Sequence, residues 1–116
     1  MKVIKLGTVR KITMHVEGAR RVSKQVPISA ADGSPSFSFR VFTIRPGGHT
    51  PYHTHPFEHL NYIIAGRGAL VTKTGRERPV RKGDFALVLP NEKHQYRNVS
   101  KTRPLVMICA VPRQYE

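Results

Sequence analysis

Residues 53–59 read His53-Thr54-His55-Pro56-Phe57-Glu58-His59, and they lead into the apolar, β-branched run His59–Ala65. Side chains two positions apart on an extended chain point to the same face, so His53 and His55 project together. Pro56 interrupts the extended segment, and a turn there could bring His59 back toward the first pair. A fourth histidine, His94, begins the later run His94–Asn98. This pattern predicts strands joined by a turn, with imidazole rings converging near their ends.

Four converging imidazole rings are a ligand set for a transition metal. Neutral imidazole suits Zn, Cu, Fe and Ni, and manganese is suited where positions stay open for oxygen ligands. The spacing leaves a second interpretation open, in which the histidines are separate hydrogen-bonded surface groups. Imidazole binds metal only when neutral and its ordinary pKa is ~6.5, so metal is expected to be lost below that pH. His15 and His49 have no partner at useful spacing, and His49 could lie near the mouth of the site.

The rest of the chain has the same strand-like character. Runs rich in Val, Ile, Phe, Tyr and Thr are separated by glycine or proline breaks such as Pro46-Gly47-Gly48. Breaks at intervals of about eight to twelve residues are typical of an all-β sandwich or barrel. One short helix is a candidate, at Glu17–Lys24. The predicted strands are Val22–Ser29, Phe37–Arg45, His59–Ala65, Ala69–Thr74, Arg78–Arg81, Phe85–Leu89, His94–Asn98 and Leu105–Val111.

Length and composition predict one globular domain. The chain has 116 residues, of which 39% are hydrophobic and 23% charged, as in ordinary folded domains. The longest apolar run, Leu105–Val111, is far shorter than the ~20 residues that a membrane-spanning helix needs. Charges interrupt the apolar amino end Met1–Leu6, so we expect no secretory signal and a cytoplasmic location. The single cysteine, Cys109, excludes an internal disulfide.

The charge is strongly basic, with 20 Lys and Arg against 7 Asp and Glu, a formal net charge of +13. Such a charge attracts nucleic acids or anionic ligands, but it also occurs on solvated surfaces without a partner. The densest basic groups are Arg20–Lys24 and Lys73–Lys82, and no aromatic residues are interleaved with them in a recognisable RNA-binding motif. Nucleic-acid binding is therefore a minor expectation.

Two stretches of the chain resemble the paired motifs of the cupin superfamily. The first runs from Gly47 through His53-Thr54-His55 to Gly66, and the second runs from Gly83-Asp84 through Pro90 and His94 to Asn98. The second motif usually has proline where Leu89 stands and glycine where Asn91 stands, although asparagine tolerates the same turn. The position of the usual glutamate ligand falls on His59. The resemblance is thus to small cupins with a four-histidine centre, and Glu58, ligating after a local bulge, is the alternative.

The resemblance implies a double-stranded β-helix, a jelly-roll barrel formed by residues 37–111 within one domain, 1–116. Residues 1–30 would be strands that cover the barrel and contact a second copy in a homodimer. The metal ligands would be His53, His55, His59 and His94, holding one divalent transition metal per chain. Manganese is the first expectation, with iron, nickel, copper or zinc as alternatives. Because four neutral ligands leave the charge of the metal uncompensated, an anionic or oxygen-donor small molecule is the expected ligand.

Strand parity indicates which other residues line the pocket. Asn61 shares the face of His59, and Tyr96 shares the face of His94. Parity leaves both faces of the last strand open, whereas the resemblance turns Met107 and Cys109 inward. Cys109 is then either an inert buried thiol or a thiol close to the metal. If Arg40 and Phe42 also face inward, Arg40 could hold an anionic substrate. The predicted pocket residues are Arg40, Phe42, Asn61, Tyr96, Met107 and Cys109.

Two main functions follow from this site. The first is a metal-dependent oxidoreductase that uses dioxygen or peroxide on a small organic substrate. The second is a module that binds or senses a small molecule without chemistry, which the lack of an obvious acid or base supports. The nearest carboxylate in sequence is Glu58, and the nearest phenol is Tyr96. No serine–histidine–aspartate triad or phosphate-binding glycine loop is evident.

Overall fold

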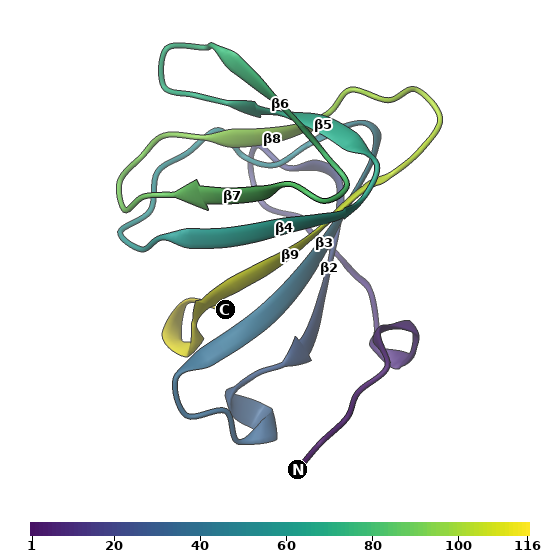
Figure 1. Cartoon of the computed structure of the whole chain (residues 1–116), viewed down its shortest axis with the longest axis vertical. Coiled ribbons are helices and arrows are strands. Elements are labelled where there is room, and N and C mark those ends of the chain that lie inside the picture. Colours follow the sequence, from purple (N-terminus) through teal and green to yellow (C-terminus); the bar gives the residue numbers. More distant parts are fainter.

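A curled antiparallel sheet makes up most of the computed structural model, which describes residues 1–116 (Figure 1). This confirms the all-β prediction. Three single 3₁₀ turns are the only helices, η1 (Leu6–Thr8), η2 (Ala30–Asp32) and η3 (Arg113–Tyr115), and none could span a lipid bilayer. The strands are β1 (Ile12–Thr13), β2 (Arg20–Ile28), β3 (Phe37–His49), β4 (His59–Ala65), β5 (Arg67–Val71), β6 (Glu77–Arg81), β7 (Phe85–Val88), β8 (Gln95–Asn98) and β9 (Leu105–Pro112).

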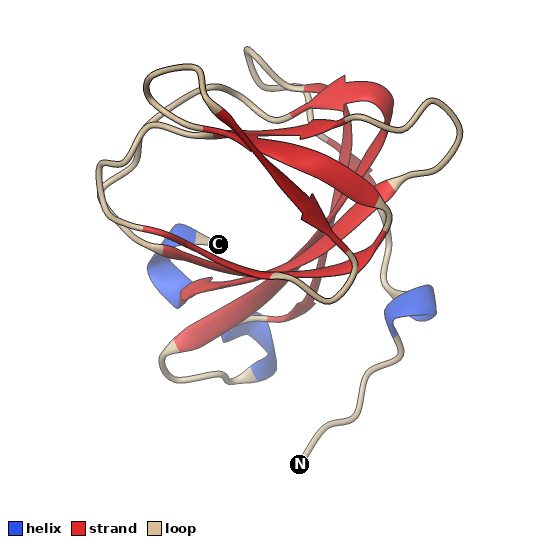
Figure 2. Ribbon diagram, turned by 45° about the horizontal axis from the view of Figure 1, so that its top comes forward, coloured by secondary structure: helices blue, strands red, loops and turns tan.

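The strands follow one another across the sheet in the order β6-β5-β8-β3-β9-β4-β7, and β2 and β1 extend the sheet from β3. Some sequence neighbours, such as β3 and β4 or β8 and β9, are thus separated, as in a rolled-up barrel, whereas β5 pairs with β6 and β2 with β3. The sheet curls so that the turn after β6 meets β4, where Ile63 donates to the carbonyl of Asp84 and accepts from the amide of Gly83, at 3.0 and 2.9 Å. Figure 2 shows the strands wrapped around a common centre. The result is a half-barrel formed by a single domain.

The helix predicted at Glu17–Lys24 is wrong, because most of this segment belongs to β2. Val22 pairs with Ile44, and Lys24 pairs with Phe42, along the edge of β3. Val22 is only 2% exposed. Local helix propensity is a weak preference, and the hydrogen bonds and apolar surface offered by β3 override it.

Strand β3 continues through the predicted break at Pro46-Gly47-Gly48. The ladder to β2 resumes at His49, which pairs with Arg20 after an irregularity in register. Gly47 has a φ of +79°, which favours glycine, and a Cβ on Gly48 would lie 2.6 Å from the carbonyl oxygen of Arg20. The glycines therefore let β3 bend and stay paired, which carries the chain into the histidine segment.

The hydrophobic core fills one end of the half-barrel and leaves the other end open for a cavity. Along β9, alternate residues point inward, and Leu105, Met107, Cys109 and Val111 are at most 1% exposed. Ile44 of β3 and Ile63 of β4 are completely buried beside them. The alternation of residues in the sequence did not show which face of β9 points inward. Pairing of β9 with β3 and β4 places the face of Leu105, Met107, Cys109 and Val111 in the core.

Candidate metal centre

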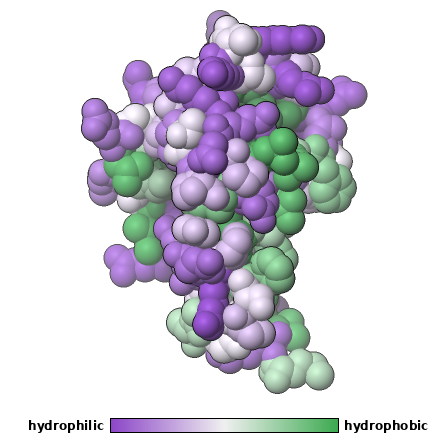
Figure 3. Space-filling view, turned by 90° about the vertical axis from the view of Figure 1, so that its left-hand side faces the viewer, coloured by the Kyte–Doolittle hydropathy of each residue, from purple (hydrophilic) through white to green (hydrophobic).

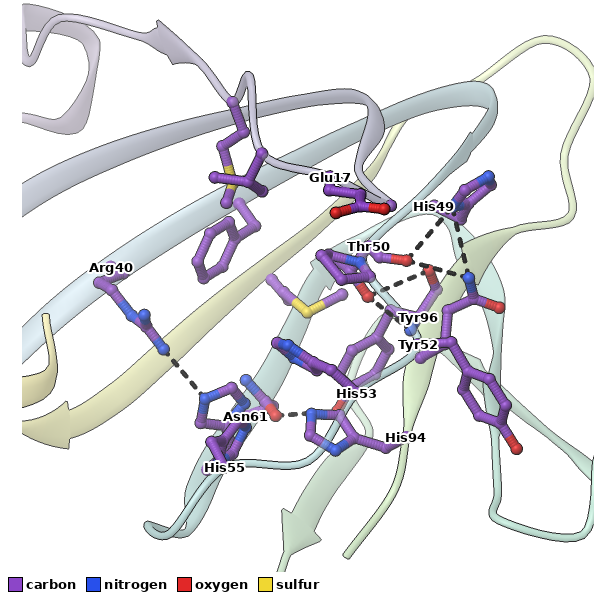
Figure 4. Close-up of a pocket in the computed structure, with 18 of the residues that line it drawn as sticks. Glu17, Arg40, His49, Thr50, Tyr52, His53, His55, Asn61, His94 and Tyr96 are labelled. Atoms are coloured by element: carbon purple, nitrogen blue, oxygen red, sulfur yellow. Dashed lines mark hydrogen bonds between the residues drawn. The ribbon is translucent and has the colours of Figure 1, made fainter. Parts of the chain in front are cut away.

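Figure 4 shows a cavity that opens between the strands beyond the core. Its volume is about 780 Å³, within the range of small-molecule sites. The lining includes all four histidines of the predicted ligand set and five of the predicted pocket residues, namely Arg40, Phe42, Asn61, Tyr96 and Met107. Cys109 differs from the prediction, because it does not line the cavity. It is completely buried, where its Sγ accepts a hydrogen bond from Arg40.

His53 and His94 meet because their backbones pair directly. The two residues form an antiparallel bridge, with N–H to carbonyl distances of 3.1 and 3.0 Å in the two directions. Their ring centroids lie 5.2 Å apart. This bridge joins two segments that are far apart in the sequence, and it fixes the separation of the two rings.

The orientations of His55 and His94 are set by backbone carbonyls. Nδ1 of His55 donates to the carbonyl oxygen of Phe57 at 2.6 Å, and Nδ1 of His94 donates to that of Glu92 at 2.8 Å. The ring of Phe57 also stacks on His55 at 4.1 Å. Hydrogen bonds of this kind place the proton on Nδ1 and leave the lone pair of Nε2 free, as in many metal-binding histidines.

Three of the histidines form a group suited to a metal ion. Potential ligand atoms of His53, His55 and His94 all lie within 4.8 Å of one another. Nε2 of His55 is buried and has no hydrogen-bond partner, and such an orphaned lone pair is costly unless something binds to it. A divalent metal ion fits this donor set.

His59 lies beside this group, but its Nε2 is hydrogen-bonded to Arg40. Its ring centroid is 4.1 Å from that of His55 and 5.4 Å from that of His94. Nε2 of His59 accepts a hydrogen bond from Nη2 of Arg40 at 3.1 Å. The structure therefore groups three of the four predicted ligands and leaves the fourth next to them. The alternative ligand, Glu58, is exposed and does not line the cavity.

The environment of the four rings favours their neutral form. Burial, the largest cause in each case, lowers the pKa of His53, His55, His59 and His94. The pKa of His59 falls to about 2, with further lowering by its histidine neighbours and by Arg40. Since a lowered pKa keeps a histidine unprotonated in more acidic solution, metal binding should extend below the pH of ~6.5 expected for ordinary imidazole.

A buried phenol and amide form the floor of the cavity. Oη of Tyr96 donates to Oδ1 of Asn61 at 2.9 Å. Burial raises the pKa of Tyr96 above its ordinary value, because a charged phenolate is poorly solvated there. Tyr96 therefore stays protonated and fixes the orientation of the Asn61 amide.

Sequence reasoning missed the part of the lining that comes from the amino-terminal segment and from the approach to His53. Glu17 is the only carboxylate on the cavity wall, whereas sequence proximity had suggested Glu58. No periodic pattern marks the segment before β2, so its position over the cavity could not be predicted. His49 lines the cavity, near where it was expected. The other unpredicted lining residues are Met14, Val16, Gly18, Thr50, Pro51, Tyr52, Phe57 and Gln95.

Comparison with known proteins identifies the fold. The sequence profile described as "Cupin domain" matches residues 40–111. The polyketide cyclase RemF from Streptomyces resistomycificus is similar in structure, with a TM-score of 0.91 and 26% identity over 97% of this chain and 79% of that chain. No curated protein sequence shows significant similarity to the chain.

Other solved structures share the fold at lower sequence identity. A predicted oxalate decarboxylase from Thermotoga maritima has a TM-score of 0.80 and 20% identity, covering 97% of this chain and 99% of that one. Ectoine synthase from P. lautus has a TM-score of 0.75 and 21% identity, covering 97% of this chain and 78% of that one. Their different activities indicate that function must be argued from the site itself.

Proposed function

The chain belongs to the cupin domain family, and from this premise we propose that it is a divalent-metal-dependent enzyme acting on a small carbonyl compound. The observation that carries the proposal is the group formed by His53, His55 and His94 on the wall of a cavity of about 780 Å³. The likeness to a polyketide cyclase, at 26% identity over nearly the whole chain, supports carbonyl chemistry. The proposed reaction class is enolisation followed by carbon–carbon bond formation.

The proposed ligand set has four histidines, with His59 joining the group of three. Its ring is 4.1 Å from His55, and its Nε2 carries a lone pair that is presently shared with Arg40. A small movement of Arg40 would free this lone pair for a metal. Manganese remains the first expectation for a site that leaves positions open to oxygen ligands, with iron, nickel, copper and zinc as alternatives.

Alanine variants of His59 and Glu58 test this ligand set. We expect His59→Ala to weaken metal binding by roughly tenfold or more, because losses of that size follow even from changes around the ligands. Glu58→Ala should leave metal affinity unchanged, since the Glu58 side chain is exposed and outside the cavity. Isothermal titration with Mn²⁺ or Zn²⁺ measures both. Equal effects, or a larger effect at Glu58, would contradict the four-histidine assignment.

The bound metal would act as a Lewis acid toward a carbonyl oxygen of the substrate. Around it, the side chains of the cavity have separate tasks. Glu17 is an exposed residue of the cavity wall and its only carboxylate (Figure 4), and we propose that it accepts a proton from carbon. The Asn61 amide, held by Tyr96, orients the substrate, while Phe42 and Met107 provide apolar contacts.

Oxidant-using chemistry is the alternative reaction on the same metal, and it is the first expectation from the sequence. An oxidisable sulfur atom speaks against it, because the thioether of Met107 lines the cavity. An oxidant generated there could convert this thioether into a polar sulfoxide. We therefore favour chemistry without electron transfer.

Deuterium exchange distinguishes these functions. The metal-loaded protein should accelerate incorporation of deuterium into the methyl group of pyruvate in D₂O, followed by NMR, roughly 10²-fold or more over the metal-free protein. An oxygen electrode in parallel detects oxidant use. Substrate-dependent oxygen uptake would instead support the oxidoreductase, and ligand binding with neither exchange nor uptake would support a binding module.

We also propose a homodimer that forms through the outer face of the sheet. Leu60 of β4 pairs with Leu87 of β7, and the two side chains are 52% and 57% exposed. Phe85, which is 82% exposed, and Phe39 of β3, which is 45% exposed, extend this apolar row. Exposed apolar patches of this kind commonly mark interfaces. Light scattering of the purified protein would contradict the proposal by giving the mass of a monomer.

Many of the basic residues lie outside this apolar row, at another end of the molecule. Hydrophilic side chains dominate the upper end of the molecule in Figure 3, where Figure 1 places the β5–β6 hairpin. That hairpin carries much of the basic group Lys73–Lys82, whose cations are exposed. This exposure supports a solvated basic surface, and nucleic-acid binding stays the minor expectation that it is from the sequence.

A further inference from the structure

Arg40 is a buried cation without a counter-ion. Its side chain comes from β3, is 8% exposed, and lines the cavity. The salt bridges of the protein are Lys2 with Asp32 and Arg97 with Glu77, so no carboxylate neutralises Arg40. Burying an unpaired charge is costly. This cost suggests that a ligand supplies the missing negative charge.

The contacts of Arg40 leave much of its hydrogen-bonding capacity unused. Nη2 reaches Nε2 of His59 at 3.1 Å and Sγ of Cys109 at 3.2 Å, and the guanidinium lies 5.0 Å from the ring centre of Phe42. Nε is buried and has no partner. A guanidinium has five N–H donors arranged to grip a carboxylate with two parallel hydrogen bonds. None of its present partners is an anion.

Arg40 and a metal ion compete for the same lone pair. Nε2 of His59 has one lone pair, and the hydrogen bond from Arg40 occupies it. If His59 is to ligate a metal through Nε2, this hydrogen bond must break. Arg40 then loses an acceptor and remains a buried cation close to a second positive charge. An anion bound to Arg40 would relieve both penalties.

We propose that Arg40 couples the binding of a carboxylate-bearing substrate to ligation of the metal by His59. The carboxylate draws the guanidinium away from Nε2 of His59, and the ring is then free to bind metal. This inference rests on the proposed metal site and narrows its substrate class to anions, with a carboxylate bound at Arg40. Arg40 acts on the metal through His59 and is thus a positioning residue as well as an anion-binding one.

Coupling of this kind is reciprocal. An anion that raises the affinity for metal must itself bind more tightly to the metal-loaded protein, by the same factor. Couplings between two sites commonly amount to roughly 5- to 150-fold in affinity. The effect should therefore be visible in binding measurements that involve no catalysis.

Calorimetric titration with Co²⁺ provides the test, with acetate as the anion probe. Sodium acetate replaces sodium chloride at constant ionic strength, and the visible absorption of bound Co²⁺ reports its coordination. For the wild type we expect acetate to raise the Co²⁺ association constant about tenfold and to change the absorption spectrum. In Arg40→Met, Co²⁺ should still bind, but acetate should no longer alter its affinity.

Three further variants sharpen the test. Arg40→Lys keeps the charge without the planar fork, and it should retain only part of the acetate effect. His59→Ala should lose the effect, because the ring through which Arg40 acts is gone. Arg78→Met removes an exposed cation of β6 that does not line the cavity, and it should behave as the wild type. Thermal melting confirms that each variant is folded.

The possible failures are distinguishable. If Co²⁺ binds to the wild type but acetate has no effect, or the same effect in a folded Arg40→Met or Arg40→Lys, the coupling is wrong and the metal site stands. If Co²⁺ does not bind to the wild type at all, the proposed function itself fails. If Arg40→Met does not fold, Arg40→Lys and His59→Ala take its place in the comparison with the wild type.

Discussion

Replacing His94 with alanine is expected to abolish stoichiometric metal binding. His94 is 4% exposed, and its Nδ1 is held by the carbonyl of Glu92, so Nε2 is presented to the cavity in one orientation. Mutation of residues that merely hydrogen-bond to a metal ligand already lowers metal affinity about 10- to 100-fold. Removal of a ligand itself should lower the affinity by more than roughly 100-fold. Elemental analysis of the dialysed protein and titration with Zn²⁺ or Mn²⁺ measure the change.

The matched control for this variant is His15→Ala. His15 is exposed and does not line the cavity, so its removal should leave metal content unchanged. His94→Gln preserves more of the buried volume and separates loss of the ligand from loss of packing. The proposed centre would be refuted if a folded His94→Ala protein kept the metal content and affinity of the wild type.

Gly66→Ala is expected to have the largest effect on stability. Gly66 joins β4 to β5 with a φ of +82°, and a Cβ there would lie 2.1 Å from the carbonyl oxygen of Pro104. The left-handed backbone costs an L-residue about 1–2 kcal/mol, and forced rearrangement of packed backbone costs about 1–3 kcal/mol more. We expect the free energy of unfolding to fall by roughly 3 kcal/mol, as measured by urea denaturation.

Gly75→Ala separates the two causes of this loss. Gly75 has a nearly identical φ of +84°, but a Cβ there would meet no atom within 4 Å. Its substitution should therefore reduce the free energy of unfolding only by the backbone cost of about 1–2 kcal/mol. Equal losses in the two variants would show that close contact with Pro104 does not constrain Gly66.

The strands could be predicted because their pattern is local. Alternating β-branched and aromatic residues between glycine and proline breaks placed most of the strands within a few residues of their observed bounds, as β4 and β9 illustrate. The helix expected at Glu17–Lys24 failed because β2 gains its stability from pairing with β3. A short window of sequence contains no information about such a partner.

In the site, too, local sequence patterns predicted some features, and only the tertiary structure revealed others. The spacing of His53 and His55 indicated a shared face, the turn at Pro56 and the later strand brought in His59 and His94, and the resemblance to cupins implied that all four ligate one metal. The lining by Glu17 depends on how the amino-terminal segment lies over the cavity. The hydrogen bond from Arg40 to His59 depends on the relative positions of β3 and β4, which have β9 between them.

The amino-acid sequence by itself determined the strand content, the two histidine segments and the cupin family, because each is written in residues close together along the chain. The tertiary structure alone decided which three rings form the closest group, that Cys109 is buried outside the cavity lining, and that no carboxylate of the chain pairs with the buried Arg40. These features arise from strand register and sheet curvature, where a shift of one residue would turn each side chain to the opposite face.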